Sequence, residues 1–296
     1  MNYNILYTYI LLIFSIKSIA QDLKVMSYNI RLDVKSDGEN WWENRKGKVA
    51  DLMNYYNADF IGCQEVLYHQ LKFLQHELTT YNYIGVGRDD GNKDGEFSCI
   101  FYSKDKFKLL SQGTFWLSPT PDTVSFGWGA ACRRVCTYGL FQSKSTKKKF
   151  WIFNTHLDHI SELARAESVK LIDKMAKKLN SKEDLPIIIT GDFNAKIDEL
   201  PAIWMSEQYN NARTVCESKP YGGIDTWNAF HFDQKPAGCI DYIFTSKKAF
   251  LPRRNPSSIL MRKPACFSPT AISRVLVRNV VTRMLTAINV RSVELR

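Results

Sequence analysis

The stretch IIITGDFNA, residues 187–195, ends a hydrophobic run with a carboxylate and a carboxamide two positions apart. Residues two apart on an extended chain point to the same side, so Asp192 and Asn194 are expected to face the space beyond a strand end together. Gly191, directly before them, allows another backbone to approach closely. The alternative is an ordinary Asp/Gly/Asn turn without a chemical role.

Other apolar runs in the chain end in the same way. The polar residues at these ends are Asn29, Gln64 with Glu65, Asn154 with His156, and Asp241. Each of them taken singly is explained as a capping or turn residue. Their recurrence indicates strand ends that converge on one rim of a layered α/β protein.

A rim rich in carboxylates and amides, with one histidine and no cysteine, suits a hard divalent cation such as Mg²⁺ or Mn²⁺. Glu65 with Asn29 is expected to hold the ion, which would neutralise charge developing on a phosphoryl oxygen. Asp192 and Asn194 would hold the attacking water and the phosphate. His156 would donate a hydrogen bond to the phosphoryl oxygens. The pattern therefore predicts hydrolysis of a phosphate ester.

The elements that position this rim alternate between strands and helices. Apolar runs predict strands at 23–30, 58–65, 97–103, 150–156, 187–190 and 238–246. Apolar residues at helical spacing predict helices at 44–56, 67–78 and 161–180. With 296 residues and no internal repeat, the chain is long enough for one large domain with a sizeable core.

The segments YNIR, IGCQE, NTHLDH, GDFNA and IDYIF occur in this order and together resemble the endonuclease/exonuclease/phosphatase family. GTFWLSPTPD (113–122) and RRVCTYGLF (133–141) resemble an exported bacterial branch close to its deadenylase-like members. The resemblance covers residues 22–246. It implies an α/β fold, a four-layer αββα sandwich of two packed mixed β-sheets flanked by helices.

The resemblance also implies a role for single residues. Glu65 matches the family's metal-binding glutamate, and Asn29 matches the asparagine beside it. His156 matches the histidine that contacts phosphate. Asp192 and Asn194 match the pair that positions the nucleophile. The expected activity is a phosphodiesterase or nuclease type, on nucleic acid, phospholipid or a small phosphodiester, because loops rather than these motifs choose the substrate.

Two further residues follow from the same resemblance. Asp241 matches the carboxylate that supports a terminal catalytic histidine. Arg165, early in the helix after THLDH, is a candidate substrate contact, and a solvated helix face is its alternative.

The chain departs from the family at its end, where the motif S-D-H-x-P-V is absent. Residues 267–277 read FSPTAISRVLV, and the last histidine, His231, precedes Asp241. Asp241 would then lack its partner, and the strand that carries the motif would be missing, which would leave the strand of Asp241 with unpaired backbone groups. We expect impaired catalysis; the alternative is an inactive member that binds a ligand or has no function.

The segment 247–296 differs from the body in composition. It holds eleven of the 40 Lys and Arg and one of the 30 Asp and Glu, so the net charge of +10 lies there and the body, with 29 of each sign, is neutral. The neutral body argues against a strong duplex-DNA binder and favours small or single-stranded phosphodiesters. The segment also lacks Gly, Asp, Trp and Tyr.

Two explanations of this segment stay open. It is a divergent tail, with a basic helix in 272–295 that binds a membrane surface or nucleic acid. Or it is translated out of frame beyond Ser246: Ala271–Arg274 encoded as GCC ATT TCC CGG yields His-Phe-Pro in a shifted frame, a fragment similar to the absent motif.

The first twenty residues are typical of a signal peptide. The run from Ile5 to Ile16 is mostly apolar and short for a membrane span, and Ser18-Ile19-Ala20 is a small-x-small cleavage site. We expect export, to the periplasm or beyond, as a monomer without a stable protein partner. No Lys or Arg precedes the apolar run, so an uncleaved anchor is the alternative.

The seven cysteines form no C-x-x-C pair, which argues against a structural zinc site. Cys63 and Cys99 lie in apolar strand-like runs and are expected as small core residues. A Cys132–Cys136 disulfide is compatible with an exported protein.

Overall fold

The computed structural model describes residues 22–216, 224–231, 238–247 and 272–278, whose strands form two sheets. The first sheet contains, in spatial order, β11 (Ile272–Arg278), β1 (Asp22–Asn29), β2 (Phe60–Gln64), β4 (Ile100–Ser103) and β3 (Tyr81–Ile84). The second contains β5 (Phe107–Trp116), β6 (Val135–Ser143), β7 (Lys149–His156), β8 (Ile187–Asp192), β10 (Asp241–Ser246) and β9 (Tyr209–Asn211).

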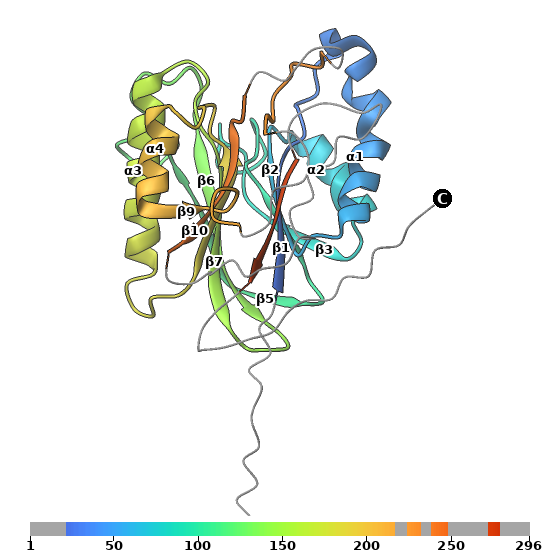
Figure 1. Cartoon of the computed structure of the whole chain (residues 1–296). Helices are drawn as coiled ribbons and strands as arrows, with labels where there is room; N and C mark the ends of the chain where they lie inside the picture. Colours follow the sequence, from blue (N-terminus) through green and yellow to red (C-terminus); the bar gives the residue numbers. More distant parts are fainter. Residues whose placement is uncertain (1–21, 217–223, 232–237, 248–271, 279–296) are drawn as a thin grey trace, which may run out of the picture.

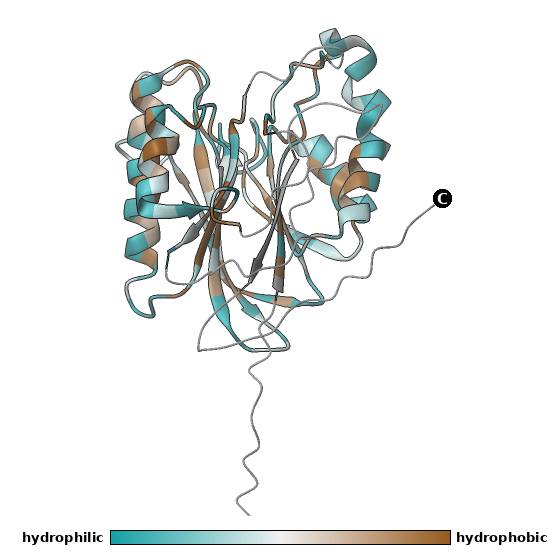
Figure 2. Ribbon diagram, viewed as in Figure 1, coloured by the Kyte–Doolittle hydropathy of each residue, from teal (hydrophilic) through white to brown (hydrophobic). Residues whose placement is uncertain are grey.

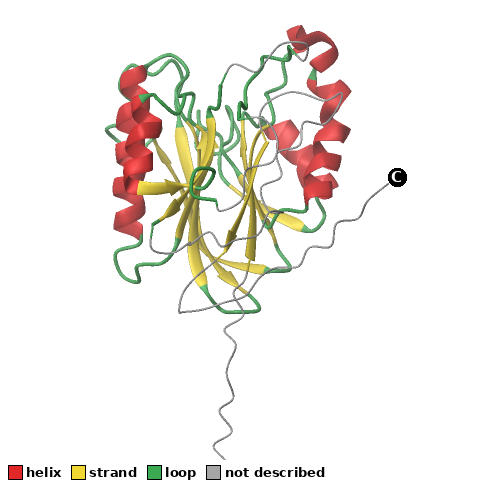
Figure 3. Ribbon diagram, viewed as in Figure 1, coloured by secondary structure: helices red, strands yellow, loops and turns green. Residues whose placement is uncertain are grey.

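Helices cover the outer face of each sheet (Figures 1 and 3). The first sheet packs against α1 (Trp42–Tyr56) and α2 (Tyr68–Glu77), and the second against α3 (Glu162–Leu179) and α4 (Leu200–Gln208). A short 3₁₀ helix, η1 (Lys35–Asn40), lies between β1 and α1. The predicted four-layer αββα sandwich is confirmed.

Aromatic side chains fill the space between the two sheets. Phe60 of the first sheet contacts Phe107, Phe141 and Phe150 of the second, with ring centroids 4.7, 4.8 and 5.4 Å away. Figure 2 shows hydrophobic residues along the strands and hydrophilic residues over much of the helices and loops. The sheets are therefore joined by an apolar core, as burial of their alternating faces requires.

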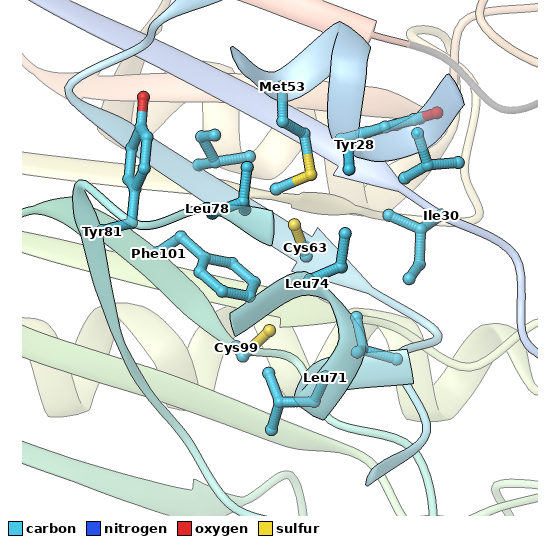
Figure 4. Close-up of a cluster of buried hydrophobic side chains, with 14 of the residues drawn as sticks. Tyr28, Ile30, Met53, Cys63, Leu71, Leu74, Leu78, Tyr81, Cys99 and Phe101 are labelled. Carbon is cyan, nitrogen blue, oxygen red and sulfur yellow. The ribbon is translucent and has the colours of Figure 1, made fainter. Parts of the chain in front are cut away.

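A second core lies between the first sheet and its helices (Figure 4). Cys63 and Cys99 are fully buried in it beside Leu71, Leu74 and Phe101. Their prediction as small core residues is confirmed.

The two parallel strand pairs bring polar strand ends to one edge of the molecule. β1 pairs with β2 and places Asn29 opposite Gln64, and β7 pairs with β8 and places His156 opposite Asp192. β10 runs antiparallel to β8, so its first residue, Asp241, lies opposite Asp192. In Figure 1, β1 leads upward to this edge.

Beneath that edge, buried amides connect the two sheets. Asn154 of the second sheet donates from Nδ2 to the carbonyls of Cys63 and Cys99, at 2.8 and 2.9 Å. Its Oδ1 accepts from Gln64 Nε2 at 2.7 Å and from Thr190 Oγ1 at 3.0 Å. Asn154 and Gln64, expected among the converging rim residues, thus hold the sheets together instead.

The sequence did not predict several of the observed elements: β3, β5, β6, α4, β9 and β11. The boundaries of the predicted elements differ from the observed ones by a few residues.

The expectation of a missing terminal strand is wrong. β11 pairs antiparallel with β1 along Asp22–Tyr28, and β10 is paired by β8 and β9 on its two sides. A helix over 272–295 is also wrong for residues 272–278, which form a strand that the β-branched residues Ile272, Val275 and Val277 favour.

Cys132 and Cys136 are free thiols, so the disulfide considered above is not present. Within the described ranges, no helix is long and apolar enough to cross a membrane. The predicted signal peptide, its cleavage site and most of the basic segment lie outside the described residues.

Removal of the amide bridge tests its structural role. Asn154→Ala removes the buried hydrogen bonds to Gln64, Thr190 and the carbonyls of Cys63 and Cys99, and we expect it to lower the free energy of unfolding by ~3 kcal/mol. Asn54→Ala, at an exposed asparagine of α1, is the matched control and is expected to change little. Chemical denaturation of both variants measures the difference; equal stabilities would show that the bridge is dispensable.

Candidate active site

Asn29 joins three strand ends at the edge of the sandwich. Its Nδ2 donates to Glu65 Oε1 at 2.7 Å and to Asp192 Oδ2 at 3.0 Å. Its Oδ1 accepts from the backbone N–H of Arg31 at 2.9 Å. Side chains at the ends of β1, β2 and β8 therefore meet at one amide, as the sequence predicts.

Glu65 begins the turn after β2 in a left-handed backbone conformation, with φ of 59°. Its Oε2 accepts from the Leu32 N–H at 3.1 Å and lies 3.7 Å from Arg31 Nη1. The Glu65 side chain keeps 14% of its surface exposed, so the carboxylate remains open to a ligand at the rim.

Asp192 and Asn194 converge through a turn rather than through strand geometry. Asn194 has φ of 45°, and its N–H donates to Asp192 Oδ1 at 2.9 Å. The turn considered as the alternative is thus present and itself directs both side chains to the rim. Gly191 is required for the approach of β7, because a Cβ there would lie 2.5 Å from the Thr155 carbonyl.

His156 is held in a defined orientation by Asn194. The Asn194 amide donates to the Leu157 carbonyl at 3.0 Å, which fixes Nδ2 as the donor toward His156 Nε2, also 3.0 Å away. Burial, and then the positive charges of Arg134 and Arg88, keep the pKa of His156 well below its usual value. The ring is therefore neutral at pH 7, with its proton on Nδ1.

The Nδ1 side of His156 faces a carboxylate that the sequence analysis missed. Glu96 Oε2 lies 3.8 Å from Nδ1, and the Arg88 guanidinium holds both Glu96 oxygens at 2.8 Å. Burial raises the pKa of Glu96, and Arg88 opposes the rise. Both residues come from GRDDGNKDGE, whose turn-forming composition predicts only a loop.

Asp241 is buried and lies opposite Asp192. Its Oδ1 has no hydrogen-bond partner in the described part of the chain. Burial and the charge of Asp192 raise the pKa of Asp241 well above its usual value, and burial raises the pKa of Asp192 to about 6. The predicted role of Asp241, support of a terminal histidine, stays a prediction.

The loop after β7 is organised by Asp158, a second group that was missed. Its carboxylate accepts from the N–H groups of Ala131, Ile160 and Ser161 at 3.1, 2.9 and 2.8 Å. Arg134 lies 3.5 Å from the same carboxylate, almost fully buried. Asp158 is the aspartate of the THLDH segment, and this motif was the sequence feature that could have identified it.

Arg165 is buried and donates to the Asp158 carbonyl at 3.1 Å. The solvated-face alternative is therefore wrong. A contact of Arg165 with substrate stays a prediction, because its observed partner, the Asp158 carbonyl, belongs to the loop after β7.

The remaining predicted residues form one connected set: Asn29, Glu65, Asp192, Asn194, His156 and Asp241. Their assigned chemical roles stay predictions.

The donor chemistry of this set fits a hard divalent cation. Glu65, Asp192 and Asp241 offer only oxygen, and burial, with a smaller contribution from the charge of Glu65, raises the pKa of both aspartates. Among the described residues no group of three His, Cys, Asp or Glu is arranged to hold a metal ion by itself. A cation there would take Glu65 and Asn29 together with water and substrate oxygens, as Mg²⁺ commonly does.

Comparison with known proteins places this arrangement in a family. Residues 26–260 match the model of the Endonuclease/Exonuclease/phosphatase family. The chain belongs to this family. It is 36% identical to a family member from Bacteroides thetaiotaomicron of known structure, with 88% of this chain and 95% of that chain covered and a TM-score of 0.78.

Two further relatives carry specific names. A mannosyl-6-phosphatase of Bacteroides thetaiotaomicron VPI-5482 is 36% identical over 88% of this chain and 100% of that chain, with a TM-score of 0.76. Nocturnin of Drosophila melanogaster is 28% identical over 52% of this chain. The match spans 24% of the length of nocturnin and 59% of the length of a mimivirus relative.

Metal binding at Glu65 can be measured without turnover. We expect millimolar Mg²⁺ or Mn²⁺ to raise the melting temperature by mass action, and Glu65→Gln to remove most of that rise. Glu183→Gln, at an exposed carboxylate paired with Lys149, is the control and should keep it. The same metal-dependent rise in all three proteins would exclude Glu65 as a ligand.

Proposed function

We propose that this protein is a divalent-metal-dependent hydrolase of phosphate esters that uses water as the nucleophile. The observation that carries the proposal is the hydrogen-bonded set Glu65–Asn29–Asp192–Asn194–His156 at one edge of the sandwich. Family membership supports a phosphoester substrate and the use of a divalent metal.

Each residue of the set has a role that follows from its surroundings. Bound at Glu65 and Asn29, the cation would stabilise negative charge on the phosphoryl group. Asp192, with a pKa of about 6, is ionised at neutral pH and accepts a proton from the attacking water. Asn194 orients that water and the phosphoryl group. His156 would donate a hydrogen bond to a phosphoryl oxygen.

A phosphomonoester of a sugar is the substrate class that similarity supports best. The mannosyl-6-phosphatase is 36% identical to this chain, and the match covers 100% of that chain. Nocturnin is 28% identical, and the match covers only 24% of its length. A small substrate also agrees with the neutral charge of the body outside residues 247–296.

A phosphodiester, the substrate class expected from the sequence, is the second candidate. Trp227 supports it, because this residue is 44% exposed and the hydroxyl of the adjacent Thr226 accepts from the Asp241 N–H at 3.2 Å. An exposed indole beside the site offers a stacking surface for a base.

We further propose that turnover is slow and that the protein is exported. Loss of a general acid/base costs ~10²–10⁴-fold in rate, and Asp241 Oδ1 is buried without a partner in the described residues. The alternative is an inactive protein, either a binding protein or the product of a shifted reading frame.

Site variants test the proposal directly. With Mg²⁺ present, the full chain should release phosphate from mannose 6-phosphate and p-nitrophenyl phosphate faster than it cleaves bis(p-nitrophenyl) phosphate. Asp192→Asn and His156→Gln should each lower the rate by ~10²-fold or more. His76→Gln changes an exposed histidine of α2 and should leave the rate unchanged.

An unaffected rate in both site variants would place the activity elsewhere. If the full chain releases no product, a second protein separates the explanations: residues 247–296 replaced by a family-like segment ending in S-D-H-F-P-V. Activity in that protein supports the site and assigns the defect to the tail. Inactivity of both proteins would overturn the proposal.

A further inference from the structure

The ends of β1 and β8 carry the same local structure. After β8, the Asn194 N–H donates to Asp192 Oδ1 at 2.9 Å, and Asn194 has φ of 45°. After β1, the Arg31 N–H donates to Asn29 Oδ1 at 2.9 Å, and Arg31 has φ of 60°. The two turns meet through the hydrogen bond from Asn29 to Asp192. Arg31 therefore occupies on the first sheet the position that Asn194 occupies on the second.

The backbone of Arg31 is held in this unfavourable conformation by buried side chains. The Arg31 carbonyl accepts from Arg45 Nη2 at 2.8 Å and from Gln70 Nε2 at 3.0 Å. Arg45 also donates to the Ile30 carbonyl. A positive φ costs free energy in a residue with a long side chain, and such strain is typical of functional positions. Two helices, α1 and α2, thus supply the groups that fix Arg31.

The guanidinium of Arg31 has one edge anchored and one edge near the rim. Asp37 of η1 accepts from Nε and Nη2 at 2.9 and 3.0 Å. The remaining nitrogen, Nη1, lies 3.7 Å from Glu65 Oε2, and the side chain is 33% exposed. Arg31 is therefore a fixed cation beside Glu65, approaching the site from the first sheet, whereas His156 and Asn194 approach from the second.

We propose that Arg31 binds a non-bridging oxygen of the substrate and selects a dianionic phosphomonoester over a phosphodiester. The inference rests on the proposed function and names the substrate class of the same site. Glu65, Asp192 and Asp241 repel a dianion, and a fixed guanidinium offsets this repulsion while donating a charge-assisted hydrogen bond. In a phosphodiester, one of these oxygens carries a second ester group and only one negative charge remains.

Binding of two phosphate probes tests the assignment without turnover. Melting temperatures of the full chain are measured with Mg²⁺ against increasing inorganic phosphate or dimethyl phosphate. The wild type should bind inorganic phosphate more tightly. Arg31→Gln should lower the affinity for inorganic phosphate by about tenfold or more, which is the effect of losing one charge-assisted hydrogen bond. The affinity for dimethyl phosphate should be nearly unchanged.

Two variants separate binding from a structural role. Asp37→Asn removes the charge of the anchor but keeps the guanidinium, and it should retain most of the phosphate affinity. Arg133→Gln changes an arginine of equal exposure, 32%, that stacks on Phe126 and pairs with Asp89. It should bind both probes as the wild type does.

Two results would overturn the inference while leaving the proposed function intact. One is wild-type affinity for inorganic phosphate in Arg31→Gln. The other is an equal loss in Arg31→Gln and Asp37→Asn, which would make Arg31 a support for η1. If the wild type neither binds inorganic phosphate nor hydrolyses an ester, the proposed function fails together with the inference.

Discussion

The geometry of the rim depends on the buried amide bridge between the two sheets. Asn154 reaches from β7 to two carbonyls of the first sheet and also binds Gln64 and Thr190. Gly62 makes room for it, because a Cβ there would lie 2.2 Å from Thr190 Oγ1 and 2.5 Å from Asn154 Oδ1. Aromatic packing alone tolerates small shifts of one sheet over another, whereas directional buried hydrogen bonds do not. The strand ends of both sheets are thereby held at the distances that let Asn29 bind Asp192.

Above this bridge three carboxylates of the described residues lie close together. Asp192 and Asp241 lie opposite each other in neighbouring strands, both buried, with Glu65 nearby. Such an arrangement costs free energy in the isolated fold, because burial disfavours each charged carboxylate and their charges repel one another. A bound cation would relieve this repulsion, so the same feature that weakens the metal-free fold favours metal binding. The connected site and the family assignment agree with this interpretation.

Sequence reasoning located the residues that follow a strand and missed those that lie in loops. Asn29, Glu65 and Asp192 could be predicted because a hydrophobic run ending in a polar side chain marks the edge of a sheet. Glu96 carries no such signal, since its proximity to His156 depends on the fold of the 85–97 loop, in which Phe97 is bridged to Gly87 and to Val66. The strand β11 was missed because the motif expected to mark it is absent from residues 267–277. The sandwich itself followed from a family resemblance rather than from periodicity.

The central claim is that the edge formed by Glu65, Asn29, Asp192 and His156 binds a metal ion and a phosphate together. Anomalous diffraction from crystals of the full chain soaked with Mn²⁺ and inorganic phosphate tests it most directly. The account predicts one strong manganese peak within coordination distance of Glu65, with phosphate density touching that peak, His156 and Asn194. Manganese bound elsewhere, with this edge empty at saturating Mn²⁺ and phosphate, would contradict it.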